Sequence, residues 1–219
     1  MGGDAAAFYD SDCVACPRLA QFLVGVREKY PSYHGLPVPP FGSIDARLLI
    51  VGLAPGMHGA NATGRAFTGD HAGILLYDTL HKFGLANQPG SDTADDGLRL
   101  LGTRITNAVK CLPPQNKPIG VEVNNCNHFL ANELALLPDG GVILALGGIA
   151  HKAIIRAFGL RQADYKFGHA AVHDLPDGLT LVNSYHCSRY NTQTRRLTTE
   201  MFETVIADAA RRAGVGQLA

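Results

Sequence analysis

Residues 47 to 56 read Arg47-Leu-Leu-Ile-Val-Gly-Leu-Ala-Pro-Gly56. Leucine and β-branched residues fill the first part of this run, and small residues with a proline end it. That pattern is typical of a buried strand that leads into a turn. Shorter apolar runs at 105–109, 142–146 and 180–183 predict three more strands.

Segments with helical spacing lie before, between and after these runs. The predicted helices are Pro17–Lys29, Gly73–Phe83, Asn127–Leu137, Gly148–Phe158 and Thr198–Ala213. Strands that alternate with helices indicate an α/β fold with a central, mainly parallel sheet. We expect a single domain over residues 1–219, because the chain has no internal repeat or low-complexity linker and suits one hydrophobic core.

The composition is that of a globular protein with balanced charge. Apolar residues make up 46% of the chain, and 19 basic residues offset 19 acidic ones. Bulk charge therefore does not indicate a nucleic-acid partner, and a DNA-binding face would need local segregation of charge. Arginines crowd the C-terminal quarter at Arg189, Arg195, Arg196, Arg211 and Arg212. For the acidic run Asp92–Asp96 we expect a solvated loop.

The sequence contains no apolar run as long as a membrane-spanning helix. Its first residues include acidic residues and cysteines, where a signal peptide needs a basic start and a long apolar stretch. We therefore expect a soluble, cytoplasmic protein without a membrane partner.

Three polar or glycine-rich segments follow predicted strands. They are Gly52–Asp70, Asn107–Asn116 and Asn183–Asn191. Ligands of open α/β sheets bind at the carboxyl ends of the strands. The sequence thus predicts that these three segments form the walls of one active site.

Each segment offers side chains that suit the recognition of a base. Phe67 could stack on a base ring, and the amides of Asn107 and Asn116 could pair with a base edge or hold a water. His186 could donate a hydrogen bond to a leaving oxygen. Asp70 could act in the chemistry or cap the predicted helix that follows it, and the asparagines could equally stabilise turns. The chain lacks both the P-loop and the G-x-G-x-x-G pattern.

Five cysteines in a chain without an export signal argue against a disulfide framework. Cys13 and Cys16 form a C-x-x-C pair, Cys111 and Cys126 form a wider pair, and Cys187 is left over. Four paired cysteines suit a zinc ion or an iron–sulfur cluster, because both accept four thiolates.

Three ordered motifs resemble the family 5 uracil-DNA glycosylases, the iron–sulfur type with broad base specificity. They are Gly52-Leu-Ala-Pro-Gly56 with Gly64-Arg-Ala-Phe-Thr-Gly-Asp70, then Ile105-Thr-Asn-Ala-Val-Lys-Cys-Leu-Pro-Pro-Gln-Asn-Lys-Pro118, then Ser184-Tyr-His-Cys-Ser-Arg-Tyr-Asn191. The similarity runs from about Cys13 to Met201. Family 4 carries a Glu at the position of Leu53, so Leu53 favours family 5.

The resemblance implies a three-layer α/β/α sandwich and a [4Fe–4S] cluster on Cys13, Cys16, Cys111 and Cys126 that ties residues 1–46 to the rest. It also implies the catalytic residues Asp70, His186 and Asn116. The implied base-binding residues are Gly52, Leu53, Ala54, Phe67 and Asn107. The implied DNA-binding loop holds Ser188, Arg189, Tyr190, Asn191, Arg195 and Arg196.

The implied activity is base excision: the protein would extrude uracil, and also hypoxanthine or xanthine, from single- or double-stranded DNA and hydrolyse the glycosidic bond. We expect a monomer, associated with the nucleoid if the source is a prokaryote. An alternative is a non-catalytic iron–sulfur protein that binds DNA or senses redox state. That alternative would need the cysteines but neither Asp70 nor His186.

Overall fold

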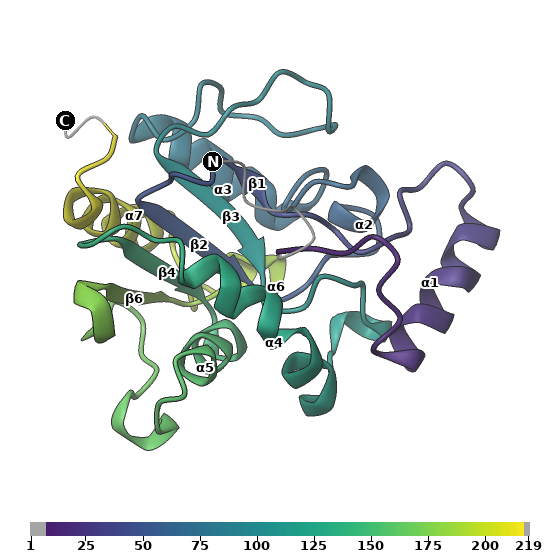
Figure 1. The fold of residues 1–219 in the computed structure, drawn as a ribbon. Helices are drawn as coiled ribbons and strands as arrows, with labels where there is room; N and C mark the ends of the chain where they lie inside the picture. Colours follow the sequence, from purple (N-terminus) through teal and green to yellow (C-terminus); the bar gives the residue numbers. More distant parts are fainter. Residues whose placement is uncertain (1–7, 217–219) are drawn as a thin grey trace.

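The computed structural model describes residues 8–216 and has a six-stranded sheet at its centre (Figure 1). The strand order is β1-β3-β2-β4-β6-β5, and the four inner strands are parallel. The two edge strands β1 and β5 run antiparallel to their neighbours. The strands are β1 (Phe41–Gly42), β2 (Leu48–Gly52), β3 (Thr103–Asn107), β4 (Val142–Leu146), β5 (Val172–Asp174) and β6 (Thr180–Ser184).

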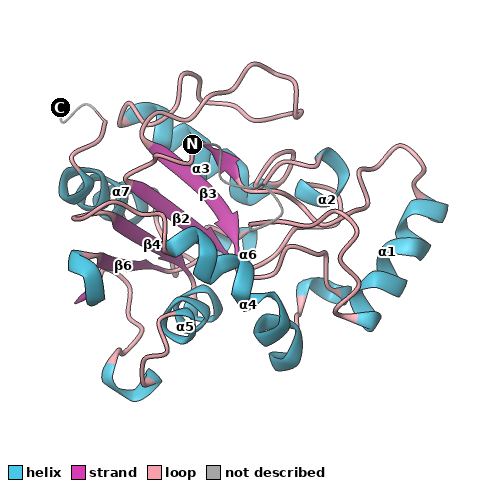
Figure 2. Cartoon of the chain, in the orientation of Figure 1, coloured by secondary structure: helices cyan, strands magenta, loops and turns pink. Residues whose placement is uncertain are grey.

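Helices and short 3₁₀ turns connect and cover these strands (Figure 2). The α-helices are α1 (Pro17–Lys29), α2 (Ala60–Thr63), α3 (His71–Lys82), α4 (Gly120–Leu134), α5 (Gly148–Ala157), α6 (Arg189–Gln193) and α7 (Thr199–Ala213). The 3₁₀ turns are η2 (Pro114–Asn116), η3 (Gln162–Asp164) and η4 (Pro176–Gly178). Within residues 8–216, no helix is long and apolar enough to cross a membrane.

Alternate residues of the inner strands enter two separate cores. Leu48 and Ile50 of β2 pack with residues of α3 and α7, whereas Leu49 and Val51 pack with residues of α4 and α5. Side chains of a strand point to opposite faces, so a strand buried on both faces is apolar throughout. The predicted α/β fold with three layers and a mainly parallel sheet is therefore confirmed.

Several predicted boundaries of strands and helices were wrong by two or more residues. Strand β3 ends at Asn107, not at 109, because its last pair with β2 is Gly52 with Asn107. Helix α4 begins at Gly120 rather than Asn127, and the Glu122 side chain accepts the Ile119 N–H over 2.9 Å at its start. The edge strands β1 and β5 were not predicted, because two or three residues carry no readable period.

Helix α1 lies at the margin of the molecule and packs on the segment that follows β3 (Figure 1). Its buried residues Leu19, Leu23 and Val26 contact a cluster that includes Val109 and Leu112. The N-terminal region is thus held by an apolar contact of its own, beside the cysteines that were predicted to tie it down.

A buried ion network joins β3 and the residues that follow it to α4. Glu133 accepts from Lys110 over 2.6 Å and from Arg104 over 3.2 Å, and the Thr106 hydroxyl bonds the same carboxylate. Lys110 and Glu133 are both buried, so each needs the other to offset its loss of hydration. The network fixes the strand end that carries Asn107.

Candidate active site

A cavity of about 860 Å³ opens at the carboxyl ends of the parallel strands. Its lining comes from the segments that follow β2, β3, β4 and β6. The three segments predicted to meet at this edge do meet there. Of the predicted catalytic and base-binding residues, the cavity is lined by Leu53, Ala54, Phe67, Asp70, Asn107, Asn116 and His186.

The two carboxylate oxygens of Asp70 have different surroundings. Its Oδ1 accepts the Gly73 N–H over 2.9 Å and so caps α3. Its Oδ2 is directed toward two glycines, because a Cβ added to Gly59 or Gly56 would lie 2.6 or 3.3 Å from that oxygen. Burial raises the pKa of Asp70, although the hydrogen bonds from Gly73 and Ala72 oppose the rise. Capping and a place in the cavity are therefore compatible.

Phe67 sits in the cavity wall on a constrained backbone. Its φ of 55° is in the left-handed region, which a side chain such as phenylalanine rarely adopts. Gly52 lacks the Cβ that would lie 2.6 Å from the Phe67 ring and 2.4 Å from Asn107 Oδ1. Gly52 thus makes room for the Phe67 and Asn107 side chains in the cavity wall.

Asn107 and Asn116 differ in how far their side chains are buried. Asn107 is buried at the end of β3, and within residues 8–216 its Oδ1 has no hydrogen-bond partner. A buried acceptor without a partner is costly, so this oxygen is available for a donor on a ligand. Asn116 is exposed on η2 with a φ of 56° and lines the same cavity.

His186 lies beside Phe67, with the ring centroids 5.9 Å apart and the rings 28° from parallel. Its Nδ1 is buried and has no hydrogen-bond partner in the described part of the chain. Burial lowers the pKa of His186 to about 4. The imidazole is therefore neutral at physiological pH and carries one N–H.

The predicted DNA-binding segment was expected to be a loop, and it instead contains the short helix α6. Ser188 caps this helix by accepting the Asn191 N–H, and the Asn191 amide donates to the His186 carbonyl over 2.8 Å. These two polar side chains hold the segment in shape. Tyr190 is 71% exposed at the cavity rim.

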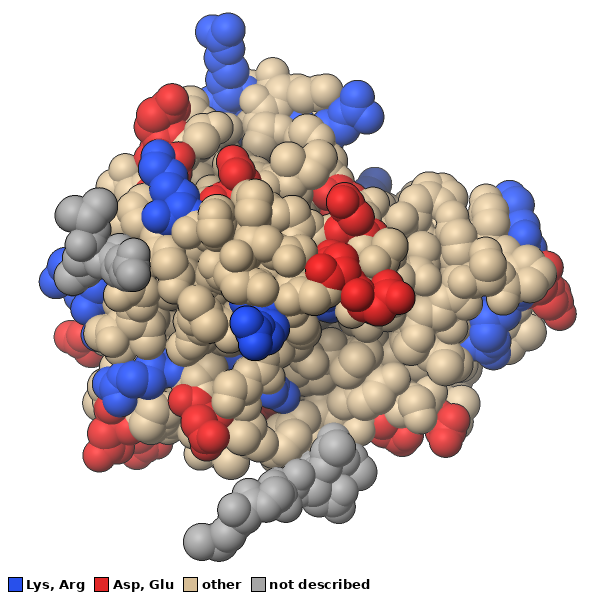
Figure 3. Space-filling model, turned by 90° about the horizontal axis from the view of Figure 1, so that it is seen from above, with Lys and Arg blue, Asp and Glu red and all other residues tan. Residues whose placement is uncertain are grey.

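Three arginines of the same segment are placed differently. Arg189 and Arg196 line the cavity, and the Arg196 guanidinium lies 4.7 Å from the centroid of the Tyr185 ring. Arg195 is exposed and has a φ of 56°. Elsewhere, Lys and Arg side chains are spread over the face seen in Figure 3 and do not gather into one basic patch.

Residues 39–210 match the Uracil DNA glycosylase superfamily. The chain belongs to this superfamily. The type-5 uracil-DNA glycosylase of Thermus thermophilus is 48% identical over 208 residues, which cover 93% of this chain and 94% of the relative. The type-5 enzyme of Pyrobaculum aerophilum is 41% identical over 207 residues, which cover 93% and 90%.

A type-4 uracil-DNA glycosylase of Thermotoga maritima matches less of the chain. It is 37% identical over 111 residues, which cover 50% of this chain and 49% of the relative. The similarity to the family 5 glycosylases, inferred from the three motifs and from Leu53, is thus confirmed by relatives that match over almost the whole length.

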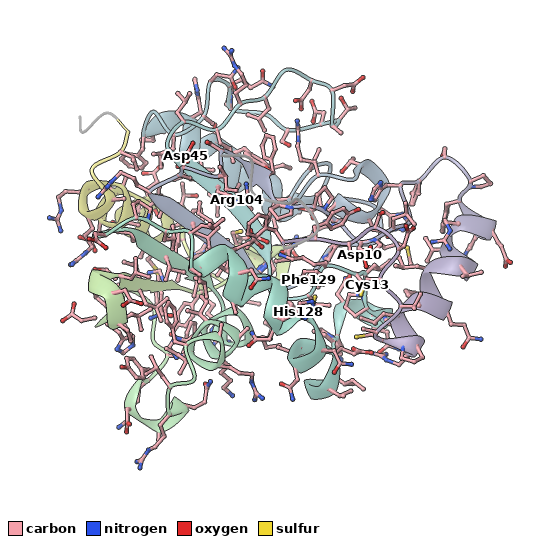
Figure 4. The ribbon with its side chains drawn as sticks, in the orientation of Figure 1. Asp10, Cys13, Asp45, Arg104, His128 and Phe129 are labelled. Carbon is pink, nitrogen blue, oxygen red and sulfur yellow. The ribbon has the colours of Figure 1, made fainter. Side chains whose placement is uncertain are left out.

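The four cysteines expected to bind a cluster border one small cavity of this glycosylase fold. Asp10 and Phe129 of α4, labelled with Cys13 in Figure 4, border the same cavity. Burial, together with the neighbouring thiols, raises the pKa of Cys111 to about 12. Among the described residues, no group of three or more His, Cys, Asp or Glu side chains has the geometry to hold a metal ion. Cys187 is buried in the core against α3 and α7 instead.

The acidic run Asp92–Asp96 does more than face solvent. Asp96 pairs with the buried Arg65 over 2.6 Å, and Arg65 also donates to the Ala94 carbonyl and the Ser91 hydroxyl. The expected solvated loop is confirmed for Asp92–Asp95, which are exposed, but Asp96 neutralises an arginine two residues before Phe67. It thereby anchors the turn that carries Phe67 and Asp70.

Two parts of the cavity were missed. Gly147, Gly148 and Ile149 follow β4 and line it, and the rule that ligands bind at the carboxyl ends of strands could have identified them. Phe167 also lines it, packed near Gly148, from the irregular segment before β5. Nothing in the sequence around Phe167 indicates this position.

The depressed pKa of His186 can be tested directly by NMR. We expect its imidazole ¹⁵N shifts to stay constant from about pH 8 to about pH 5.5 and to change only near pH 4. Because the unfolded chain binds that proton near pH 6.5, His186 should lower the free energy of unfolding as pH falls from about 6.5 toward 4. The variant His186→Gln assigns the resonance and should remove this contribution. A midpoint near 6.5 would contradict the burial argument.

Proposed function

We propose that this protein hydrolyses the N-glycosidic bond of uracil in DNA as a monofunctional base excision repair enzyme. One observation carries the proposal: a carboxylate oxygen of Asp70 and the neutral imidazole of His186 line the same cavity. The names of its type-5 relatives support it. Its substrate is DNA, so in a prokaryote the enzyme would work at the nucleoid.

The reaction separates charge between the sugar and the base, and Asp70 and His186 suit these two charges. As the bond between C1′ and the base breaks, its electron pair goes to the base, and the sugar becomes cationic. Asp70 stabilises the cation and accepts a proton from the water whose oxygen bonds to C1′. His186 donates its N–H to the oxygen of the anionic base, which then leaves with a proton from solvent. The base reaches the cavity only when extruded from the stack.

The walls of the cavity suit an extruded deaminated base. The free Oδ1 of Asn107 is an acceptor for the ring N–H that uracil, hypoxanthine and xanthine all carry. Phe67 offers a ring face, and Asn116 lies at the entrance, where it can hold a water or a base edge. Leu53 and Ala54 add no polar group, so the wall has little with which to reject a purine. We therefore include hypoxanthine and xanthine among the substrates.

The rim segment that begins at Ser188 supplies the contacts with the DNA strand. Tyr190 is the exposed aromatic ring beside the cavity, and it has the size to fill the gap left by an extruded base. Arg189, Arg195 and Arg196 contact phosphates, which adds a salt-dependent part to the affinity.

We further propose that Cys13, Cys16, Cys111 and Cys126 hold a [4Fe–4S] cluster. The four side chains border one cavity, and two of the sulfurs accept N–H groups, from Lys110 to Cys126 over 3.3 Å and from Asn125 to Cys16 over 3.6 Å. Burial disfavours the thiolates, which a cationic iron core would offset. The bound cluster would fasten the segment before α1 to the segment before η2.

Asp70→Asn tests the proposed chemistry. The amide can still cap α3, so the fold should persist, while single-turnover release of uracil should fall on the order of 10²-fold or more. DNA binding should stay within a few fold. The control Asp78→Asn changes an exposed residue of the same helix and should behave as wild type. Brown wild-type protein that releases no base would favour the redox sensor, and an active Asp70→Asn would leave Asp70 as a cap alone.

Cys111→Ser tests the proposed cofactor. The variant should purify without visible absorbance and with poor solubility, because a lost ligand leaves the site incomplete and metal binding is coupled to folding. Iron, zinc and sulfide analysis of the wild type identifies the metal. Cys187→Ala removes a cysteine from the core and should keep the colour. A brown, active Cys111→Ser would mean that the proposed ligand set is wrong, and zinc without iron would change the metal.

Tyr190→Ala tests the wedge. Excision from paired duplex should slow more than excision from single strands, because only the duplex must be unstacked, at roughly a few kcal/mol. Tyr190→Phe keeps the ring and should restore the duplex rate. Equal losses on both substrates would argue against a wedge.

A further inference from the structure

A second groove of about 540 Å³ adjoins the active-site cavity. One wall is helix α1, and the opposite wall holds Met57, His58 and Pro114. Met57 and His58 also line the cavity that contains Asp70. In the same way, η2 contributes Pro114 to the groove and Asn116 to the cavity. The two spaces are therefore neighbours that share a wall.

The chemistry of the groove is apolar with positive charge at its border. Phe22, Val26, Tyr30 and Met57 provide the apolar surface. Lys29 is exposed, with its ammonium 5.3 Å from the centroid of the Tyr30 ring. Among the described residues that line the groove, none is acidic.

Arg18 adds a guanidinium whose charge is largely offset. It pairs with Glu122 over 2.7 Å, and it donates to the Lys117 carbonyl over 3.2 Å. Lys29 is thus the cation of this wall that is most available to an anionic group of a ligand. The α1 wall includes Gly25, where an added Cβ would meet nothing within 4 Å. This glycine leaves open space in the middle of the groove wall.

We propose that this groove binds the unpaired segment of the substrate strand on one side of the extruded base. The inference rests on the proposed function and extends it to a flanking subsite. Apolar and aromatic surface beside a cation is the combination that binds single strands, because bases and sugars cover the surface while a phosphate meets the charge. A duplex would present its phosphates to the apolar floor, which would gain nothing from them. The wall shared with the cavity lets one strand occupy both spaces.

Two variants of helix α1 test the subsite by different means. Gly25→Leu fills the groove without a change of charge, and the substitution favours the helix. Lys29→Glu reverses the charge at the border. Lys152→Glu is the matched control, because Lys152 is an exposed residue of α5 that lines neither the groove nor the cavity, and the change in net charge is the same. Uracil release is measured on single strands of about 15 and about 5 nucleotides, with the uracil central or near either end.

We expect Gly25→Leu and Lys29→Glu to raise KM for the long strand about 5- to 10-fold, with kcat unchanged. The short strand should show no change, and the loss should vanish when the flank on one side is absent. Lys152→Glu should match wild type on every substrate. Equal effects of Lys29→Glu and Lys152→Glu, or equal effects on long and short strands, would overturn the subsite.

Two further outcomes are distinguishable. If wild type releases uracil from both strands and both groove variants match it, the subsite fails while the proposed function stands. If wild type releases no uracil from either strand, the function itself fails. Sedimentation velocity completes the test: a change of oligomeric state in Gly25→Leu would assign the groove to a second copy of this chain and overturn the proposal.

Discussion

The hydrogen bond from the Gly73 N–H to Asp70 Oδ1 starts helix α3 and positions the acid at the same time. At Gly73 an added Cβ would lie 1.8 Å from the Phe67 carbonyl oxygen, so the helix start and the Phe67 turn can approach only through glycine. The Tyr77 hydroxyl donates to the Ala66 carbonyl over 2.6 Å from within the core. These contacts hold Phe67 in its left-handed backbone conformation, whose strain they must offset. The part of the cavity wall that contains Phe67 is therefore held in place by α3.

Burial disfavours the charged forms of both groups that the proposed reaction uses. It raises the pKa of Asp70 and lowers that of His186 to about 4. In the free protein this is a cost, because the Asp70 carboxylate is partly buried and His186 Nδ1 has no hydrogen-bond partner among the described residues. A cationic sugar beside the carboxylate and an anionic base beside the imidazole would offset that cost at the same moment. Low polarity strengthens both interactions, so a partly buried site can favour a charge-separated transition state.

The sequence predicted the elements that are long enough to show a periodic pattern of apolar residues. Helix α1 and strand β4 have the predicted limits, and the meeting of three segments at one sheet edge followed from parallel strands alone. Asp70 and His186 were found because each is a titratable group beside a predicted strand end or turn. The orphaned Oδ1 of Asn107 could not be predicted, because it depends on which neighbours fail to reach it.

Features that depend on contacts far apart in the sequence were beyond prediction. The Arg65–Asp96 pair joins two segments with no shared pattern, and the α1 groove needs Met57 and Pro114 brought opposite a helix near the N-terminus. Asp70 at the start of α3 and His186 just after β6 are half-buried, whereas Tyr190 and Lys29 are exposed on short or peripheral helices. Groups that take part in chemistry need rigid support, whereas side chains that contact a DNA strand can tolerate motion. A half-buried cavity with exposed margins suits the proposed extrusion of the base.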